Sequence, residues 1–347
     1  MDSNNTLSKY GVIGAGSFGL AIANLLAENG DVLIYARNEQ QVKDININHL
    51  SKNYVMKEAV VATNDLKTIA AECQLIFPIV PSNGFVSMLE DIAPYLKPYH
   101  VLIHGTKGLH TPKKISGDIL LRKEEVFTMS ELIKVKTGVV RIGCLAGPNL
   151  ASELAEDQPA ATVIASKFNE VIELGQQALR SSRFQVYGSN ELLGVELAGV
   201  LKNYVAIASG MLTGLGYGEN ARALLITRGM AELIYIAKAL GANEKAFLGL
   251  AGIGDLIATC NSPKSRNYRV GLKLAEGKKL DEIIASIGEV AEGVKTLQIV
   301  KAMQKYGYRA PLAEILYKIV FEDLAIKKGI DFLMRFSSDK DAEYIVS

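Results

Sequence analysis

The sequence predicts an α/β protein: a mostly parallel sheet in an N-terminal domain, residues 1–190, followed by an all-helical domain, residues 191–347. Short continuous apolar runs alternate with helical patterns in the first half, which is typical of a parallel sheet covered on both faces. In the second half apolar residues recur at helical spacing and no strand pattern returns. A chain of 347 residues is also long for a single hydrophobic core, so two domains are expected.

Short apolar or β-branched segments, each bounded by turn residues, indicate the strands of the sheet. They are 10–13, 32–36, 60–62, 75–80, 101–104, 139–146, 161–165 and 184–187. The first leads into a glycine turn, and the alanine- and leucine-rich stretch 18–28 then predicts a helix. The charged segment 120–135 lacks a clear period and is expected to be a surface excursion between two strands.

Helical periodicity predicts the elements of the second domain. They are 191–210, 219–240, 244–250, 265–276, 280–286, 294–306 and 311–328. No glycine- or serine-rich linker separates the halves, so we expect the boundary to run into the first long helix.

Composition excludes several classes of function. The 38 basic and 37 acidic residues give a net charge of +1, so nothing indicates a nucleic-acid partner. Three dispersed cysteines without a CxxC pair favour a reduced, cytoplasmic compartment. The polar N-terminus does not resemble a signal peptide, and no membrane insertion is expected. His100 and His104 are four apart on a predicted strand, a spacing that does not form a metal site, so none is expected.

A glycine-rich turn directly after the first predicted strand indicates a dinucleotide site. Residues 14–19 read Gly-Ala-Gly-Ser-Phe-Gly, a GxGxxG that opens a predicted helix. Gly14 permits the tight turn, Gly16 lets the backbone approach a pyrophosphate, and Gly19 lets the helix pack close to the sheet. The free N–H groups at the start of the helix favour phosphate binding.

The end of the second strand bears on the choice of cofactor. An acid at this place binds the ribose hydroxyls of NAD, whereas this chain has Arg37, which can pair with a 2′-phosphate. A solvated loop arginine is the alternative interpretation. The sequence therefore favours NADP(H), with NAD(H) also accepted.

Two further turns follow predicted strands, where ligands bind in open α/β sheets. Lys107 lies in Gly105–Leu109, and Gly147 and Asn149 lie in Ala146–Asn149. Each segment by itself is also compatible with a simple turn.

The helical half offers candidate groups for proton transfer and for phosphate binding. Lys202 is flanked by small and apolar residues, and desolvation there would lower its pKa toward neutrality, unless the side chain extends to water. Asp255 ends a glycine-rich turn. The run Ser265-Arg266-Asn267 suits a phosphate, or else a helix start capped by Ser265 with an exposed arginine.

Taken together, these segments resemble the bacterial NAD(P)-dependent glycerol-3-phosphate dehydrogenases. The similar segments follow the family's order and cover nearly the whole chain. They are GAGSFG (14–19), GTKGL (105–109), AGPN (146–149), ELAGVLKN (196–203), ENARALLITRGMAE (219–232), GLAGIGDL (249–256), SRNYRVG (265–271) and VAEG (290–293). The glycine turn is generic, but the lysine helix, the glycine–Asp turn and the SRN segment together are specific.

The resemblance implies a Rossmann-type N-terminal domain, a helical substrate-binding domain and a homodimer. It implies interconversion of sn-glycerol 3-phosphate and dihydroxyacetone phosphate, which supplies phospholipid synthesis. Lys202 would be the general acid/base, with Lys107 and Asp255 in the catalytic group. Substrate-binding positions would be Lys107, Gly147, Asn149, Lys202, Asn203, Asp255, Ser265, Arg266 and Asn267. Cofactor-binding positions would be Gly14, Gly16, Ser17, Phe18, Gly19, Arg37, Lys107, Ala151, Arg266, Val290 and Glu292.

The sequence departs from the family pattern in two places, and other functions remain open at this level. Members commonly carry serine or threonine where this chain has Asn149, and the stretch 110–137 is longer and more charged than expected. A hydroxyacyl-CoA dehydrogenase would need a catalytic histidine, yet no histidine lies beyond His110. A ketopantoate reductase would not need the phosphate-binding run, and a non-catalytic dinucleotide sensor would lack an acid/base group.

Overall fold

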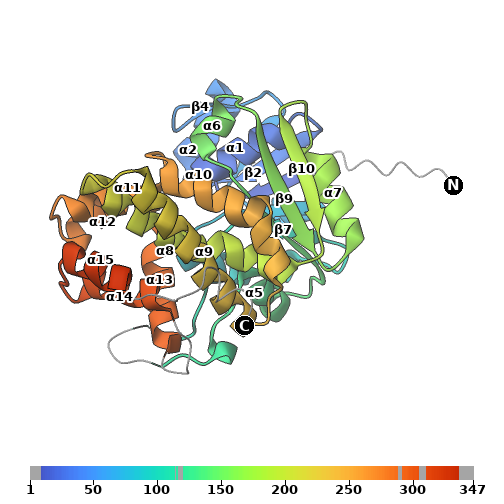
Figure 1. Cartoon of the computed structure of the whole chain (residues 1–347). Helices are drawn as coiled ribbons and strands as arrows, with labels where there is room; N and C mark the ends of the chain where they lie inside the picture. The colour runs from blue at the N-terminus through green and yellow to red at the C-terminus, as the bar shows by residue number, and fades with distance from the viewer. Residues whose placement is uncertain (1–8, 114, 116–119, 288–290, 305–309, 336–347) are drawn as a thin grey trace. The chain divides into compact units, whose positions relative to one another are not determined.

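The computed structural model describes residues 9–113, 115, 120–287, 291–304 and 310–335 (Figure 1). By packing, the chain divides into two compact units. Unit 1 comprises the chain up to Thr106 together with Met129–Leu192, and unit 2 comprises Lys107–Thr128 together with the chain from Leu193 onward. The excursion that leaves unit 1 after Thr106 therefore packs with the helical part of the chain.

Unit 1 is built on an eight-stranded sheet. Its strands are β1 (Lys9–Ile13), β2 (Asp31–Tyr35), β5 (Val60–Thr63), β6 (Leu75–Pro78), β7 (Val101–His104), β8 (Arg141–Ala146), β9 (Ala160–Ser166) and β10 (Phe184–Ser189). The order is β10-β9-β8-β7-β6-β1-β2-β5, with every pair parallel except β8 and β9. This confirms the predicted mostly parallel sheet.

Helices cover both faces of this sheet, which explains the continuous apolar strands. On one face Val12, Ile34 and Phe77 pack with Leu20 of α1 (Ser17–Leu26) in a single core. Alternate positions such as Ile76 point to the other face and are also fully buried. The first face also receives α7 (Asn169–Leu179), and the second face receives α3 (Leu66–Glu72).

Two parts of unit 1 differ from the sequence prediction. A small antiparallel pair, β3 (Leu50–Ser51) and β4 (Tyr54–Val55), was not foreseen because each strand has only two residues. The prediction of a surface excursion at 120–135 is wrong for the C-terminal part of this segment, where α5 (Met129–Lys136) forms. Its buried Met129, Leu132 and Ile133 stand at i, i+3 and i+4, the apolar stripe of a docked helix.

Unit 2 is helical in its described residues apart from turns and the isolated bridge of His110 with Phe127. Its main helices are α8 (Leu192–Gly214), α9 (Glu219–Ala239), α10 (Asp255–Asn261), α11 (Arg266–Ala275), α12 (Leu280–Ile287), α13 (Glu292–Gln304), α14 (Pro311–Phe321) and α15 (Ile326–Arg335). The predicted helical region is confirmed, and the positions of most of its helices agree within a few residues.

Two of the helices expected in unit 2 differ in the structure. The segment expected at 244–250 is a 3₁₀-helix, Glu244–Leu248, followed by a π-helical turn, Leu250–Gly254, that runs into α10. A side chain at Gly252 would lie 2.2 Å from the carbonyl oxygen of Phe247, so the tight turn requires glycine. The single helix expected at 311–328 is two helices, because Asp323 adopts a left-handed φ of 54° and ends α14.

The long helix α8 forms the core of unit 2. By length and composition it could cross a membrane, but 94% of its most apolar window is buried inside the protein. Such burial is the property of a core helix in a helical unit. Lys202 lies on this helix, so the candidate proton donor is carried by the most deeply packed element of unit 2.

A buried carboxylate connects three helices of unit 2. Glu232 on α9 accepts hydrogen bonds from the hydroxyl of Tyr204 at 2.9 Å and from the amides of Leu312 at 2.7 Å and Ala313 at 3.0 Å. Those amides belong to the first turn of α14, whose N-cap, Ala310, offers no side-chain acceptor. Glu232 therefore caps α14 from a neighbouring helix.

This carboxylate should make stability depend on pH. Burial raises the pKa of Glu232 from 4.5 to about 7, although its three hydrogen bonds oppose the rise. Between these values the folded state holds a proton that the unfolded state releases, so the free energy of unfolding falls as pH rises. We expect the stability advantage of the native protein over Glu232→Ala to shrink from pH 5 to pH 7 in urea denaturation. An advantage that stays constant across this range would contradict the raised pKa.

Candidate active site

The glycine turn between β1 and α1 has the geometry that a dinucleotide phosphate needs. Gly14 has a left-handed φ of 115°, and a side chain at Gly19 would lie 1.8 Å from the carbonyl oxygen of Gly14. Gly16, the N-cap of α1, has open space where a side chain would be. No acidic residue stands in the first turn of α1. The turn therefore fits the pyrophosphate of a dinucleotide.

The remaining predicted cofactor contacts lie on separate elements. Ser17 and Phe18 open α1, and Arg37 is exposed two residues beyond β2. Ala151 opens α6 (Ala151–Ala155), and Glu292 opens α13. Val290 lies outside the described residues.

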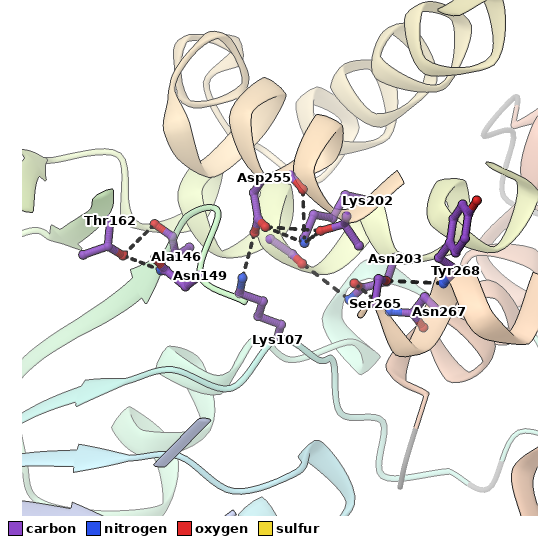
Figure 2. A network of polar contacts seen from close by, with 12 residues as sticks. Lys107, Ala146, Asn149, Thr162, Lys202, Asn203, Asp255, Ser265, Asn267 and Tyr268 are labelled. Carbon is purple, nitrogen blue, oxygen red and sulfur yellow. Dashed lines mark hydrogen bonds and ion pairs between the residues drawn. The ribbon is translucent and has the colours of Figure 1, made fainter. Parts of the chain in front are cut away.

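Two lysines share one buried carboxylate in unit 2. Asp255, the first residue of α10, accepts a hydrogen bond from Nζ of Lys202 through Oδ1 and from Nζ of Lys107 through Oδ2, each at 2.7 Å (Figure 2). The side chains of Lys202 and Asp255 are 4% and 3% exposed, whereas that of Lys107 is 22% exposed. The structure therefore brings together the residues predicted to be catalytic, from positions 107, 202 and 255 of the chain.

The surroundings of Lys202 prepare it for proton transfer near neutral pH. The pKa of Lys202 is lowered from 10.5 to about 8. Burial is the main cause, the ammonium of Lys107 acts in the same direction, and Asp255 opposes both effects. At this pKa the side chain is an ammonium at pH 7 and can still release its proton. The alternative in which Lys202 extends to water is wrong, because the residue is buried.

Thr259 is a member of this cluster that the sequence reading missed. Its hydroxyl contacts Nζ of Lys202, and it lies 3.3 Å from Oδ1 of Asp255. Thr259 follows Asp255 by four residues on α10, so the two side chains share one face of the helix. That spacing is the signal that could have found it.

The predicted phosphate-binding run lies at the start of α11. Ser265 is the N-cap, and its hydroxyl oxygen accepts from the amide of Tyr268 at 3.3 Å. Arg266 is exposed, whereas Asn267 is buried and donates from Nδ2 to Oδ1 of Asn203 at 3.0 Å. The capping role considered for Ser265 is therefore present, beside an arginine that is accessible to a ligand.

Asn149 is held inside unit 1 by Thr162. Its Nδ2 donates to the hydroxyl oxygen of Thr162 at 2.8 Å, and that hydroxyl donates to the carbonyl oxygen of Ala146 at 3.2 Å (Figure 2). Oδ1 of Asn149 is buried and has no hydrogen-bond partner among the described residues. The atom that Asn149 can still offer is thus an acceptor, suited to a hydroxyl group.

Family models and a curated relative match nearly the whole chain. The family model for the N-terminus of NAD-dependent glycerol-3-phosphate dehydrogenase matches residues 9–172, and the model for its C-terminus matches residues 191–331. A glycerol-3-phosphate dehydrogenase (NAD(P)+) of Ectopseudomonas mendocina is 41% identical over 345 residues, 98% of each chain.

Solved structures show the same relationship. The crystal structure of glycerol-3-phosphate dehydrogenase from Coxiella burnetii has a TM-score of 0.84 and 32% identity, covering 94% of this chain and 98% of that one. The enzyme from Saccharomyces cerevisiae has a TM-score of 0.81 and 25% identity, covering 94% and 99%. With both family models matched in order and a relative 41% identical over nearly the full length, the chain belongs to the NAD(P)-dependent glycerol-3-phosphate dehydrogenases.

Proposed function

We propose that this member of the family interconverts sn-glycerol 3-phosphate and dihydroxyacetone phosphate with Lys202 as proton donor and acceptor. The observation that supports this role is the sharing of Asp255 by Lys202 and Lys107. A buried lysine whose pKa is lowered to about 8 can exchange a proton under working conditions. A non-catalytic dinucleotide sensor would not need an acid/base group with a pKa near neutrality.

In the reductive direction the residues act on a single carbonyl group. When bound, NADPH or NADH supplies a hydride to the carbonyl carbon of dihydroxyacetone phosphate. Lys202 gives its proton to the carbonyl oxygen as negative charge develops there, and Lys107 stabilises that charge. Asp255 and Thr259 hold Nζ of Lys202 in place throughout. In the oxidative direction neutral Lys202 removes the proton from the hydroxyl group.

The phosphate group does not react, but its binding orients the carbonyl. We assign its binding to the cluster around the start of α11, with Arg266 as the main cation and the side chains of Ser265, Asn267 and Asn203 beside it. Gly147 and Asn149 contribute contacts to the substrate, and the free acceptor of Asn149 suits a hydroxyl of glycerol 3-phosphate. We assign cofactor contacts to Gly14, Gly16, Ser17, Phe18, Gly19, Arg37, Lys107, Ala151, Arg266, Val290 and Glu292.

An activity assay tests this function directly. We expect the purified protein to oxidise NADPH or NADH in the presence of dihydroxyacetone phosphate and to reduce dihydroxyacetone, which lacks the phosphate, far more slowly. Ketopantoate and a 3-ketoacyl-CoA serve as controls for the other dehydrogenases considered, and we expect neither to be reduced. Equal rates with and without the phosphate would remove the phosphate site at α11.

The choice of cofactor is tested at the end of β2. Arg37 is exposed there and can pair with the 2′-phosphate of NADPH. In Arg37→Asp the new carboxylate repels that phosphate, so we expect KM for NADPH to rise well beyond KM for NADH. Lys43 is an exposed lysine on α2 (Glu39–Asn48), and Lys43→Asp is the matched control. It should change neither the KM for NADPH nor the KM for NADH. Equal changes for both cofactors in Arg37→Asp would contradict the assignment.

We further propose a homodimer in the cytoplasm whose glycerol 3-phosphate enters phospholipid synthesis. The family membership supports the metabolic role, and the long apolar helix α8 is buried inside unit 2. Sedimentation of the purified protein at micromolar concentration tests the assembly, and a monomer would contradict it.

A further inference from the structure

A chain of hydrogen bonds joins three helices of unit 2. The backbone amide of Gly293 on α13 donates to Oδ1 of Asn267 on α11 at 3.0 Å. Nδ2 of Asn267 donates to Oδ1 of Asn203 on α8 at 3.0 Å, and Nδ2 of Asn203 lies 3.4 Å from the carbonyl oxygen of Gly199. Figure 2 shows Asn203 and Asn267 side by side next to Lys202. The two asparagines are 4% and 8% exposed, so water does not compete with these bonds.

The backbone groups at the two ends of this series of hydrogen bonds fix which side-chain atoms donate and which accept. A backbone amide can only donate and a backbone carbonyl can only accept. Because Gly293 donates, Asn267 must present its oxygen to α13 and its NH₂ group to Asn203. Asn203 must in turn present its oxygen to Asn267 and its NH₂ group to Gly199. Neither amide can be turned around without placing two donors or two acceptors face to face in a buried site.

Gly293 also sets how closely the helices approach. A Cβ atom at this position would lie 2.7 Å from the carbonyl oxygen of Asn203 and 2.7 Å from Oδ1 of Asn267. Both distances are shorter than any ordinary contact, and one of the two atoms belongs to backbone. Any side chain at Gly293 would therefore separate α13 from α8 and α11.

Each of the three hydrogen-bonded residues directly follows, in the sequence, a residue to which we assign a ligand contact. Lys202 precedes Asn203, Arg266 precedes Asn267, and Glu292 precedes Gly293. Resting on the proposed function, we propose that Gly293 is a positioning residue: through the amides of Asn267 and Asn203 it sets the spacing between the cofactor-contacting start of α13 and the proton-donating Lys202. It touches no reacting atom itself.

The test uses Gly293→Ala in the full-length protein. A displacement of about 1 Å between reacting groups can cost about a hundredfold in rate, and we expect kcat for dihydroxyacetone phosphate to fall by about ten- to a hundredfold. The primary isotope effect on kcat with 4-deuterated NADPH should rise, because the hydride step becomes more rate-limiting. The rate with phosphate-free dihydroxyacetone should fall by a similar factor, which damage to phosphate binding alone would not produce.

Gly329→Ala is the matched control. Its Cβ atom would lie 2.8 Å from side-chain atoms of Ile315 and Ile319, where α15 packs on α14 outside the amide chain. We expect it to lower the melting temperature without changing kcat or the isotope effect. A Gly293→Ala enzyme that behaves like this control would overturn the proposal while leaving the proposed function intact. A native protein that does not reduce dihydroxyacetone phosphate would overturn both.

A second pair of variants keeps the proposal testable if Gly293→Ala does not fold. Asn203→Asp retains the oxygen that accepts from Asn267 and loses only the donor to Gly199, a contact of 3.4 Å within α8. Asn267→Asp instead loses the donor that joins α11 to α8 at 3.0 Å and sets two acceptors face to face between these helices. Both add one negative charge to the same cluster. The fixed direction predicts a larger loss of kcat and a larger isotope effect for Asn267→Asp. Equal losses of kcat in the two variants, or a larger loss in Asn203→Asp, would overturn the proposal.

Discussion

A Lys202→Met enzyme is expected to fold and to bind NADPH, but to reduce dihydroxyacetone phosphate at least about a hundredfold more slowly than the native enzyme. Methionine keeps the apolar stem inside the packed helix α8 but removes the proton that the developing alkoxide needs. The glycine turn at 14–19 is unchanged, so cofactor binding should survive. Steady-state kinetics, NADPH fluorescence and circular dichroism measure the three properties separately.

The pH dependence of the native enzyme gives a second readout for Lys202. Its pKa of about 8 means that the ammonium form, which gives the proton, disappears above that pH. We expect kcat for reduction to fall as pH rises through about 8 and this limb to be absent in Lys202→Met. Lys238→Met, at a lysine 38% exposed on α9, should change neither rate nor profile. A folded Lys202→Met enzyme with near-native turnover would contradict the role of Lys202 and make Lys107 the leading candidate for the proton donor.

An Asp255→Ala enzyme is expected to lose both stability and activity. Removing the carboxylate leaves the buried ammonium of Lys202 without its charge partner, and breaking such a buried pair costs about 3–5 kcal/mol. Urea denaturation should show this loss of the free energy of unfolding. The pKa of Lys202 should fall in the absence of Asp255. The residual rate of reduction should therefore decrease at a lower pH than it does in the native enzyme.

The matched control for Asp255→Ala is Asp331→Ala, an exposed acid on α15 of the same unit, which should be nearly neutral. Asp255→Asn keeps the shape of the side chain and separates the loss of charge from the loss of packing. Unchanged stability in Asp255→Ala would show that the two lysines are not held by this carboxylate.

Much of the fold could be predicted because the local patterns agree with the final structure. Buried parallel strands such as 32–36 appear in the sequence as continuous apolar runs bounded by turns. The failures occurred where a single backbone conformation decides the element. The left-handed Asp323 divides the expected helix 311–328, and the close approach at Gly252 allows the π-helical turn. Neither residue type by itself indicates such a conformation.

The candidate site shows the same limit. Lys202, Lys107 and Asp255 stood out as polar residues at glycine turns or on an apolar helix face, and the structure brings them together. The amide chain could not be predicted, because Asn203 and Asn267 are 64 residues apart and nothing local marks them as partners. A buried asparagine is recognised only once the helices that enclose it are in place.

The packing of Lys107–Thr128 with the helical unit has a consequence for protein engineering. The chain passes from one unit to the other three times, after Thr106, after Thr128 and after Leu192. A single cut near residue 190 would leave a helical fragment in which Asp255 keeps Lys202 but lacks Lys107. Chimeras that exchange the helical unit between relatives should therefore carry two segments, the excursion and the C-terminal part, as one inherited block. An exchange of the C-terminal segment alone would pair Lys107 of one protein with Lys202 and Asp255 of another.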